Sequence, residues 1–305
     1  MAVELAKQLR DHTRSDAIES YRELKETTPT MPDFRRMGLA TLDYFFLHHR
    51  IKAKTKHHFS FYDAMKDETM RKKLTDLVVR YKKKPLSSYD DTGLKKMQYQ
   101  VFQLYYGSIN QFRPIVAKWV YEHFQPKHGI LDFSAGWGGR ALAALSLGIP
   151  YIGIDANKQL EASYHRMIEA VEPDPSTRSS IRLYFQPSET VDFSKFDYDL
   201  VFTSPPYFMI EEYEKMPAYG SKEAFLEKFF IPVTLSVWKN LRRRGHMALN
   251  MPEEMFDAIK DHLPKTSERI KMPLSNRHPT NAVKRQTLGK KDKERFEIIY
   301  VWSKN

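Results

Sequence analysis

A polar and aromatic cluster follows a short apolar run in residues 199–208, DLVFTSPPYF. The apolar residues 200–202 predict a buried strand, and the proline pair after them must end it because proline has no N–H for the strand ladder. Ser204, the Pro205 carbonyl and the Tyr207 ring then gather at the carboxyl end of a strand, where open α/β sheets bind ligands. Hydrogen-bond acceptors beside a flat aromatic ring suit a planar group that carries an exocyclic amine. The alternative is a plain strand-to-loop turn that uses two prolines.

A glycine-rich turn lies between a predicted strand and a predicted helix in residues 129–140, GILDFSAGWGGR. Glycines allow the backbone to approach a ligand closely, and the first turn of the helix offers free N–H groups. The turn lacks the Gly-Lys-Ser/Thr ending of a phosphate-binding loop. Its G-W-G-G spacing also differs from the G-x-G-x-x-G pattern of nicotinamide dinucleotide sites, so neither of these two ligand classes is favoured.

A second short strand in residues 149–154 ends in Asp155, 23 residues after Asp132. An acidic side chain about 20 residues beyond a glycine turn hydrogen-bonds ribose hydroxyls in Rossmann-like sites. We therefore predict that Asp155 contacts a ribose. The alternative is an N-cap for the helix that follows.

Three segments in chain order resemble motifs of the amino-methyltransferases, which transfer a methyl group from S-adenosylmethionine to N6 of adenine or N4 of cytosine. Residues 94–124 are similar to motif X, the glycine turn resembles motif I, and the string D-[apolar]3-T-S-P-P-Y at 199–207 resembles motif IV. The turn departs from the common D-P-F-x-G-x-G form, since Phe133 occupies the proline position. Backbone contacts to a ligand are unaffected by that change.

The resemblance implies S-adenosylmethionine as the cofactor and no metal. It implies a catalytic amine clamp made of Ser204, Pro205, Pro206 and Tyr207. It also implies that residues 185–188, at the end of a third strand, lie near the adenine ring of the cofactor. The cofactor contacts that we infer in this way are Phe112, Asp132, Ser134, Ala135, Gly136, Gly138, Asp155, Ala156, Gln186 and Pro187.

The fold implied by the resemblance is α/β: a class I, Rossmann-like methyltransferase sheet that is mostly parallel and ends in an antiparallel hairpin, with helices on both faces. We predict a catalytic domain at 93–305 and a helical region, a candidate for target recognition, at 1–92. The strands expected beyond those already named are 181–186, 246–251, 270–274 and 296–302. The main helices expected are 34–50, 61–81, 222–241 and 253–263.

The target base stays open between two amines. In the family S-P-P-Y leans toward N4 of cytosine, whereas N-P-P-Y and D-P-P-Y lean toward N6 of adenine. We expect a nucleic-acid partner, with DNA favoured over RNA, and the glycine-tryptophan-glycine turn also resembles that of methyltransferases from large viruses and phages. The alternatives are an RNA methyltransferase, a nucleic-acid-binding protein on a degenerate methyltransferase scaffold, and a methyltransferase of small molecules or proteins.

Composition restricts the class of protein. The chain has 305 residues, a formal net charge of +11 and no cysteine. The lack of cysteine excludes disulfides, thiolate metal sites and the cysteine attack needed for C5-cytosine methylation. A strongly basic chain is expected for a partner of phosphates. With no signal-peptide pattern and no run near the roughly 18 apolar residues of a membrane span, we expect a soluble cytoplasmic or nuclear protein.

Several charged segments allow more than one interpretation of their role. The basic run at 80–85 could grip phosphates or could be a solvated helix end. We favour nucleic-acid contact for the basic loop 275–295, and we expect the acidic, aromatic loop 211–220 to be able to fold over the site. The histidine pairs 48–49 and 57–58 are predicted to be structural or to contact nucleic acid. Neighbouring histidines on a helix point about 100° apart and do not easily share a metal.

Overall fold

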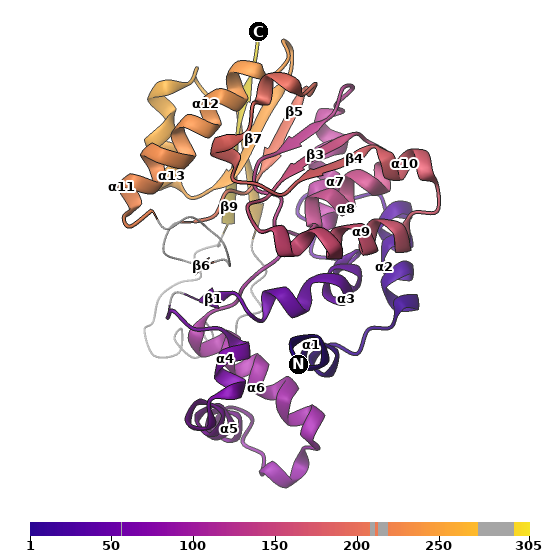
Figure 1. The fold of residues 1–305 in the computed structure, drawn as a ribbon, viewed down its shortest axis with the longest axis vertical. Coiled ribbons are helices and arrows are strands. Elements are labelled where there is room, and N and C mark those ends of the chain that lie inside the picture. Colours follow the sequence, from indigo (N-terminus) through magenta and orange to yellow (C-terminus); the bar gives the residue numbers. More distant parts are fainter. Residues whose placement is uncertain (56, 208–210, 213–218, 274–295) are drawn as a thin grey trace.

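The computed structural model describes residues 1–55, 57–207, 211–212, 219–273 and 296–305 (Figure 1). Its centre is a seven-stranded sheet with the order β4-β3-β2-β5-β7-β9-β8. The strands are β2 (Ile130–Asp132), β3 (Tyr151–Ile154), β4 (Ile181–Tyr184), β5 (Leu200–Thr203), β7 (His246–Met251), β8 (Glu268–Pro273) and β9 (Phe296–Ser303).

Strand direction identifies the fold class. β4, β3, β2, β5 and β7 are parallel neighbours, whereas β9 runs antiparallel to both β7 and β8. This order and these directions are those of the class I methyltransferase sheet, so the predicted α/β fold and its final hairpin are confirmed. The order reverses between β2 and β5, and open α/β sheets bind ligands at such a switch point.

Helices cover both faces of the sheet, and the strand sequences explain why. Successive strand residues point to opposite faces. Leu200 and Phe202 of β5 belong to one buried apolar cluster, whereas Val201 between them belongs to another. Buried on both sides, such strands need the nearly continuous apolar runs seen in the sequence.

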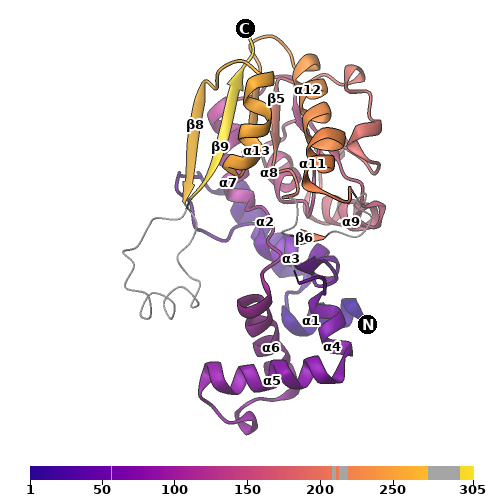
Figure 2. The ribbon, with the colours of Figure 1, turned by 90° about the vertical axis from the view of Figure 1, so that its left-hand side faces the viewer.

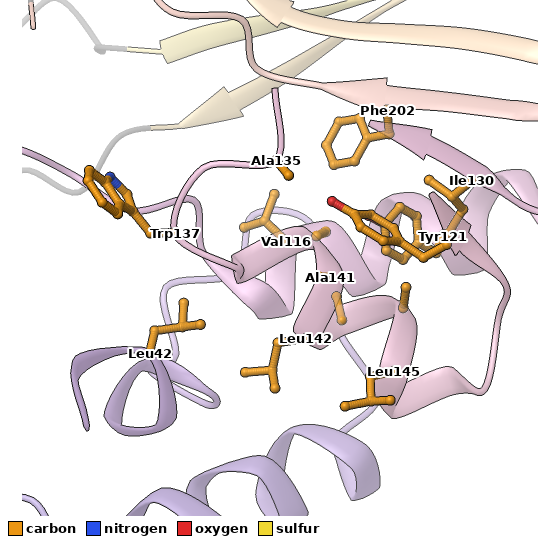
Figure 3. Packing of buried hydrophobic residues seen from close by; sticks show 14 of the residues in the cluster. Leu42, Val116, Tyr121, Ile130, Ala135, Trp137, Ala141, Leu142, Leu145 and Phe202 are labelled. Atoms are coloured by element: carbon orange, nitrogen blue, oxygen red, sulfur yellow. The ribbon is translucent and has the colours of Figure 1, made fainter. Parts of the chain in front are cut away.

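The first face packs against helices from two parts of the chain (Figure 3). Leu42, Val116, Leu142 and Phe202 belong to one buried cluster, which extends from α3 to the sheet in Figure 3. Buried side chains of α3, α7 and α8 thus form one hydrophobic core with the sheet. The helices on this face are α2 (Arg14–Glu26), α3 (Leu39–Arg50), α7 (Pro114–Phe124), α8 (Gly139–Leu147) and α9 (Glu161–Val171).

The second face packs against the C-terminal helices. Phe225, Phe230, Val233 and Phe256 belong to the cluster of that face. The helices that contribute are α11 (Lys222–Phe225), α12 (Ile231–Asn240) and α13 (Glu253–Ile259), with a π-helical turn at Leu226–Phe230 between α11 and α12. The short α10 (Pro175–Ser179) precedes β4.

A helical arm projects from the sheet domain. It contains α4 (Phe61–Lys66), α5 (Glu68–Lys82) and α6 (Asp91–Tyr106), and Figure 2 shows α5 at the end of the molecule farthest from the sheet. The arm has an apolar cluster of its own, in which Phe61, Leu74 and Phe102 are buried together with residues of α1 (Ala2–Leu9). Two short strands, β1 (Lys54–Thr55) and β6 (Glu211–Glu212), pair antiparallel beside it.

Two features differ from the sequence expectations. The helix expected at 61–81 is two helices, because the Asp67 side chain accepts a hydrogen bond from Met70 N at 2.8 Å and so starts a new helix. The division expected at residue 92 falls inside α6, while α2 and α3 pack on the sheet domain. Lys118 fixes α2 there, since its buried ammonium donates to the carbonyls of Leu24 and Thr27 at the end of that helix.

The described helices include none that is both long and apolar enough to cross a membrane.

Candidate active site

A cavity of about 430 Å³ lies at the carboxyl ends of β2, β3 and β5. Its walls come from distant stretches of chain, among them the segment before α7, the glycine turn after β2, the ends of β3 and β7, and the turn after β5. Ten of the fourteen residues that the sequence nominates line it: Phe112, Ser134, Ala135, Gly136, Asp155, Ala156, Ser204, Pro205, Pro206 and Tyr207. The motifs that are separate in sequence therefore share one cavity.

The other four nominated residues lie outside the cavity lining. Asp132 is fully buried below the glycine turn, and Gly138 is the N-cap of α8. Gln186 and Pro187 are replaced in the lining by the next two residues, Ser188 and Glu189. Ser188 Oγ donates to the Phe133 carbonyl at 2.6 Å and thereby ties the end of the third parallel strand to the glycine turn.

The shape of the glycine turn requires its glycines. Gly136 and Gly138 have φ of 62° and 80°, in the left-handed region that side chains disfavour. A Cβ on Gly139 would lie 2.1 Å from the Phe112 carbonyl oxygen. The close approach of these two backbones brings the segment before α7 against the glycine turn and closes one side of the cavity.

A buried ion pair supports this turn from below. Arg140 Nε donates to Asp132 Oδ2 at 2.6 Å, and Tyr151 OH donates to the same oxygen at 2.6 Å. Burial alone would lower the pKa of Arg140, but the Asp132 carboxylate outweighs it and raises that pKa. Arg140 therefore stays charged, and its guanidinium also donates to the Ser134 carbonyl. Asp132 acts on the cavity through the shape of the turn.

Asp155 links the glycine turn to the end of β3. Its carboxylate accepts hydrogen bonds from Gly136 N and Asn157 N, both at 2.8 Å. Burial raises the pKa of Asp155 to about 6, because the hydrogen bonds from the two backbone amides only partly offset the loss of solvation. The side chain lines the cavity. A carboxylate there can accept further hydrogen bonds, as two adjacent hydroxyls would supply.

The opposite wall is organised by a single amide. Asn250 Nδ2 lies 3.3 Å from Ser204 Oγ, 3.3 Å from Tyr207 OH and 3.1 Å from Glu297 Oε2. Asn250 is 2% exposed, and its Oδ1 has no hydrogen-bond partner among the described residues. Since both amide hydrogens must serve three oxygens, this wall holds polar groups that are only partly satisfied.

Sequence reasoning missed Asn250 and Glu297, both of which line the cavity. The signal for Asn250 was available, because an asparagine inside the apolar strand HMALNM is unusual. Glu297 could not be found in this way. It is placed beside Asn250 by the antiparallel pairing of β7 with β9, in which Asn250 faces Ile299.

Asp199, the first residue of the motif IV string, has a different place. Its carboxylate accepts hydrogen bonds from Lys127 N at 2.7 Å and from His128 N and Gly129 N, both at 3.1 Å. These groups precede β2, so Asp199 lies at the end of the sheet away from the cavity. It holds the start of β2 beside β5 and has a structural role.

The histidine pairs gather no metal ligands in the described residues, where no group of three or more His, Asp or Glu side chains could hold an ion. Burial lowers the pKa of His49 to about 3, so its ring is neutral, and its Nε2 lies 3.0 Å from Ser163 Oγ. The loop 275–295 and residues 208–210 and 213–218 lie outside the described residues.

Comparisons with known proteins show likeness at the level of solved structures. No family model matches the chain, and no curated protein does. TrmN from Thermus thermophilus is 17% identical over 63% of this chain and 49% of its own, with a TM-score of 0.44, so the chain spans about half of its length. An RNA methyltransferase from Salinibacter ruber in complex with S-adenosyl-L-homocysteine is 11% identical over 64% of this chain and 93% of its own length, with a TM-score of 0.37. The glycopeptide N-methyltransferase MtfA is 13% identical over 61% of this chain and 94% of its own length, with a TM-score of 0.36.

Proposed function

We propose that this protein is an S-adenosylmethionine-dependent methyltransferase that acts on an exocyclic amine of a nucleic-acid base, N4 of cytosine or N6 of adenine, with DNA favoured. The observation that carries the proposal is the shared cavity. The glycine turn with Asp155 forms one wall, and the Ser204–Tyr207 turn with Asn250 and Glu297 forms the other. A donor site and an acceptor site that open into one cavity suit a transfer between two bound molecules.

The glycine-turn wall fits the cofactor. A cavity of about 430 Å³ falls within the range of small-ligand sites. Backbone groups of residues 134–136 line it without bulky side chains, and the Asp155 carboxylate offers acceptors for ribose hydroxyls. When bound, S-adenosylmethionine supplies an electrophilic methyl group on a sulfonium. The residues named here would hold its nucleoside and amino-acid parts.

The opposite wall fits the amine. An exocyclic amine is a weak nucleophile, because its lone pair is delocalised into the ring. Ser204 Oγ and the Pro205 carbonyl would accept its two N–H groups and draw the nitrogen toward tetrahedral geometry, which frees the lone pair. Asn250 donates to Ser204 Oγ, which leaves that oxygen a lone pair for the amine. The Tyr207 ring would stack on the base.

The methylated nitrogen must then lose a proton. The new N–C bond uses the nitrogen lone pair, so the nitrogen becomes cationic until one N–H is removed. Glu297 is the carboxylate of this wall, and Asn250 holds its Oε2 at 3.1 Å. Its other oxygen is the proton acceptor in our proposal, so that Glu297 ends the step protonated and the amine ends it neutral.

The nucleic-acid class is supported by chemistry and by charge. A net charge of +11 suits a phosphate-bearing substrate. A target inside a duplex would have to be flipped into the cavity at a cost of a few kcal/mol. RNA is the second candidate substrate. A methyltransferase of small molecules or proteins would show little effect of salt on substrate binding, whereas phosphate contacts give a steep one.

The test combines cofactor binding with methyl transfer. Calorimetry should detect binding of S-adenosylmethionine by the full chain, and labelled methyl groups should then enter DNA or RNA but not protein. If calorimetry detects no cofactor affinity with the cofactor in large excess, the enzyme is ruled out and the degenerate-scaffold alternative is favoured. Label transferred only to protein or to small molecules would refute the nucleic-acid substrate.

A further inference from the structure

The surface of α5 carries a concentration of unpaired positive charge. Arg71, Lys72, Lys73, Arg80, Lys83 and Lys84 are exposed, and none of them forms an ion pair with a residue that the structure describes. Lys72, Lys73 and Arg80 lie within about 100° of one another around the helix axis, and we call these three residues the α5 basic face. The neighbouring helix α6 differs, since Lys95 pairs with Asp91 at 2.6 Å and Lys96 with Asp11 at 3.4 Å.

The helix dipole accounts for only half of this charge. Cations stabilise the C-terminal turn of a helix and destabilise the N-terminal end. Arg80, Lys83 and Lys84 lie at or just beyond the C-terminus of α5, where they are favoured. Residues 71–73 lie in its first two turns and gain nothing from the dipole. Lys73 Nζ lies 5.8 Å from the centre of the Tyr106 ring, but none of the three cations has a carboxylate partner among the described residues, and this charge points to an anionic ligand outside the chain.

The arm that carries this face is held by an apolar cluster that it shares with α1 and the end of α3. Leu74 and Val78 of α5 are fully buried against Tyr99 and Phe102 of α6 and Phe61 of α4. The charged residues are not needed to cover this cluster, because they lie on the remaining surface of the helix. Substitutions of the exposed cations should therefore leave the arm folded.

Two connections join the arm to the walls of the cavity. α6 leads without a further helix into residues 107–113, of which Ser108, Asn110 and Gln111 line the cavity. On the other side of the arm, β1 pairs with β6, with Lys54 opposite Glu212. β6 follows the Ser204–Tyr207 turn closely in sequence. The arm is thus connected to both walls of the cavity, through the segment packed on the glycine turn and through the strand paired with β1.

We propose that the α5 basic face binds the sugar–phosphate backbone of the nucleic acid whose base enters the cavity. The inference rests on the proposed function for the identity of the ligand. A strand gripped along α5, a helix of about 22 Å at 1.5 Å per residue, is held at a fixed place relative to the cavity through the two connections. The face supplies affinity and position, while base choice is left to the cavity.

The test removes three of these charges from the full chain. The variant Lys72→Ala/Lys73→Ala/Arg80→Ala is compared with a matched control, Lys239→Ala/Arg243→Ala/Lys265→Ala. The control removes three exposed cations in or shortly after α12 and α13, helices that Figure 1 shows at the other end of the molecule from α5. Binding to fluorescent duplex DNA, single-stranded DNA and RNA of one sequence is measured by anisotropy between about 50 and 200 mM salt.

We expect the arm variant to bind about tenfold more weakly and to lose about 2–3 units from the slope of log affinity against log salt, since each phosphate contact contributes about 0.7–0.9. Turnover at saturating nucleic acid and affinity for S-adenosylmethionine should stay unchanged, and the control variant should behave as wild type. Unchanged binding by the arm variant would overturn the proposal. An arm-dependent affinity for anionic lipid vesicles, with nucleic-acid binding unaffected, would also overturn it.

Failure of the proposed function gives a different result. If the arm variant binds nucleic acid more weakly but no methyl group is transferred to DNA or RNA, nucleic-acid binding by the α5 basic face is supported and the proposed reaction is refuted. If methyl transfer is seen and the arm variant keeps a wild-type KM for nucleic acid, the proposed reaction is supported and the proposed binding role of the α5 basic face is refuted.

Discussion

The two walls of the cavity differ in how far their polar groups are satisfied. On the glycine-turn wall, Gly136 N and Asn157 N both donate to Asp155, and Tyr164 OH donates to the Gly136 carbonyl. On the Ser204 wall, one Asn250 amide group serves three oxygens, and Asn250 Oδ1 has no partner in the described part of the chain.

This difference separates binding from reaction. A wall whose groups already hold one another is pre-organised, so it can bind its ligand with little ordering cost. A wall with unused hydrogen-bonding capacity can make interactions with the amine that strengthen as its nitrogen becomes tetrahedral, and interactions stronger in the transition state favour the reaction over simple binding. We therefore expect substitutions on the two walls to affect different measured quantities.

The largest effect is expected from Ser204→Ala. Removing the acceptor that orients the amine should lower single-turnover methyl transfer by about 10²–10³-fold, the range for loss of one oriented hydrogen-bond partner. Affinity for S-adenosylmethionine, measured by calorimetry, should stay near normal.

Thr203→Val is the matched control, because Thr203 Oγ1 is buried without a partner among the described residues. This neighbouring substitution should keep turnover and leave stability equal or slightly higher. Equal loss of turnover in both variants would mean that the hydroxyl chemistry of Ser204 is not specific.

Glu297→Gln tests the proton acceptor on the same wall. A glutamine oxygen can still accept the hydrogen bond from Asn250, so the wall keeps its arrangement while the carboxylate is lost. We expect turnover to fall by about 10²-fold, at the lower end for general base catalysis, with the KM for nucleic acid and the affinity for the cofactor unchanged. A rate within a factor of two or so of wild type would remove Glu297 from the mechanism.

Asp155→Ala tests the glycine-turn wall. Loss of a charged acceptor should weaken cofactor binding by about 10–10²-fold, from about 1.5–3 kcal/mol per hydrogen bond to a charged group. Turnover at saturating cofactor should change far less. If Asp155→Ala and Ser204→Ala reduce cofactor affinity equally, the two walls have been wrongly separated.

The pH dependence of cofactor affinity gives the smallest effect and a clear sign. Since burial raises the pKa of Asp155 to about 6, this carboxylate is ionised at neutral pH and becomes protonated as the pH falls below that value. A protonated carboxyl loses acceptor capacity, so calorimetry should find affinity falling about tenfold from about pH 7.5 to pH 5. Asp155→Asn should show a flat profile. An affinity that rises toward acidic pH would contradict the assignment.

The sequence predicted residues within single strand–turn units better than residues that meet across strands, for a physical reason. Gly136 and Asp155 belong to consecutive strand–turn units, so short-range spacing already places them together. Asn250 and Glu297 meet only because β9 returns antiparallel beside β7. Such a contact depends on strand register, which one sequence does not specify locally.

The N-terminal region shows a second limit of the same kind. The spacing of apolar residues predicted the helices but could not show which part of the fold each helix packs against. α2 joins the sheet domain through Lys118, which donates to the carbonyls at the end of that helix from more than 90 residues away in the chain. The break between α4 and α5, in contrast, was readable from Asp67 as an N-cap.

The central claim is that the cavity places a methyl donor beside an exocyclic amine of a nucleic-acid base. The most direct measurement is nucleoside mass spectrometry of DNA and RNA after incubation with the full chain and isotope-labelled S-adenosylmethionine. We predict a labelled methyl group on N4 of cytosine or N6 of adenine, which disappears with Ser204→Ala. Label on neither amine, in DNA and RNA alike, would contradict the account.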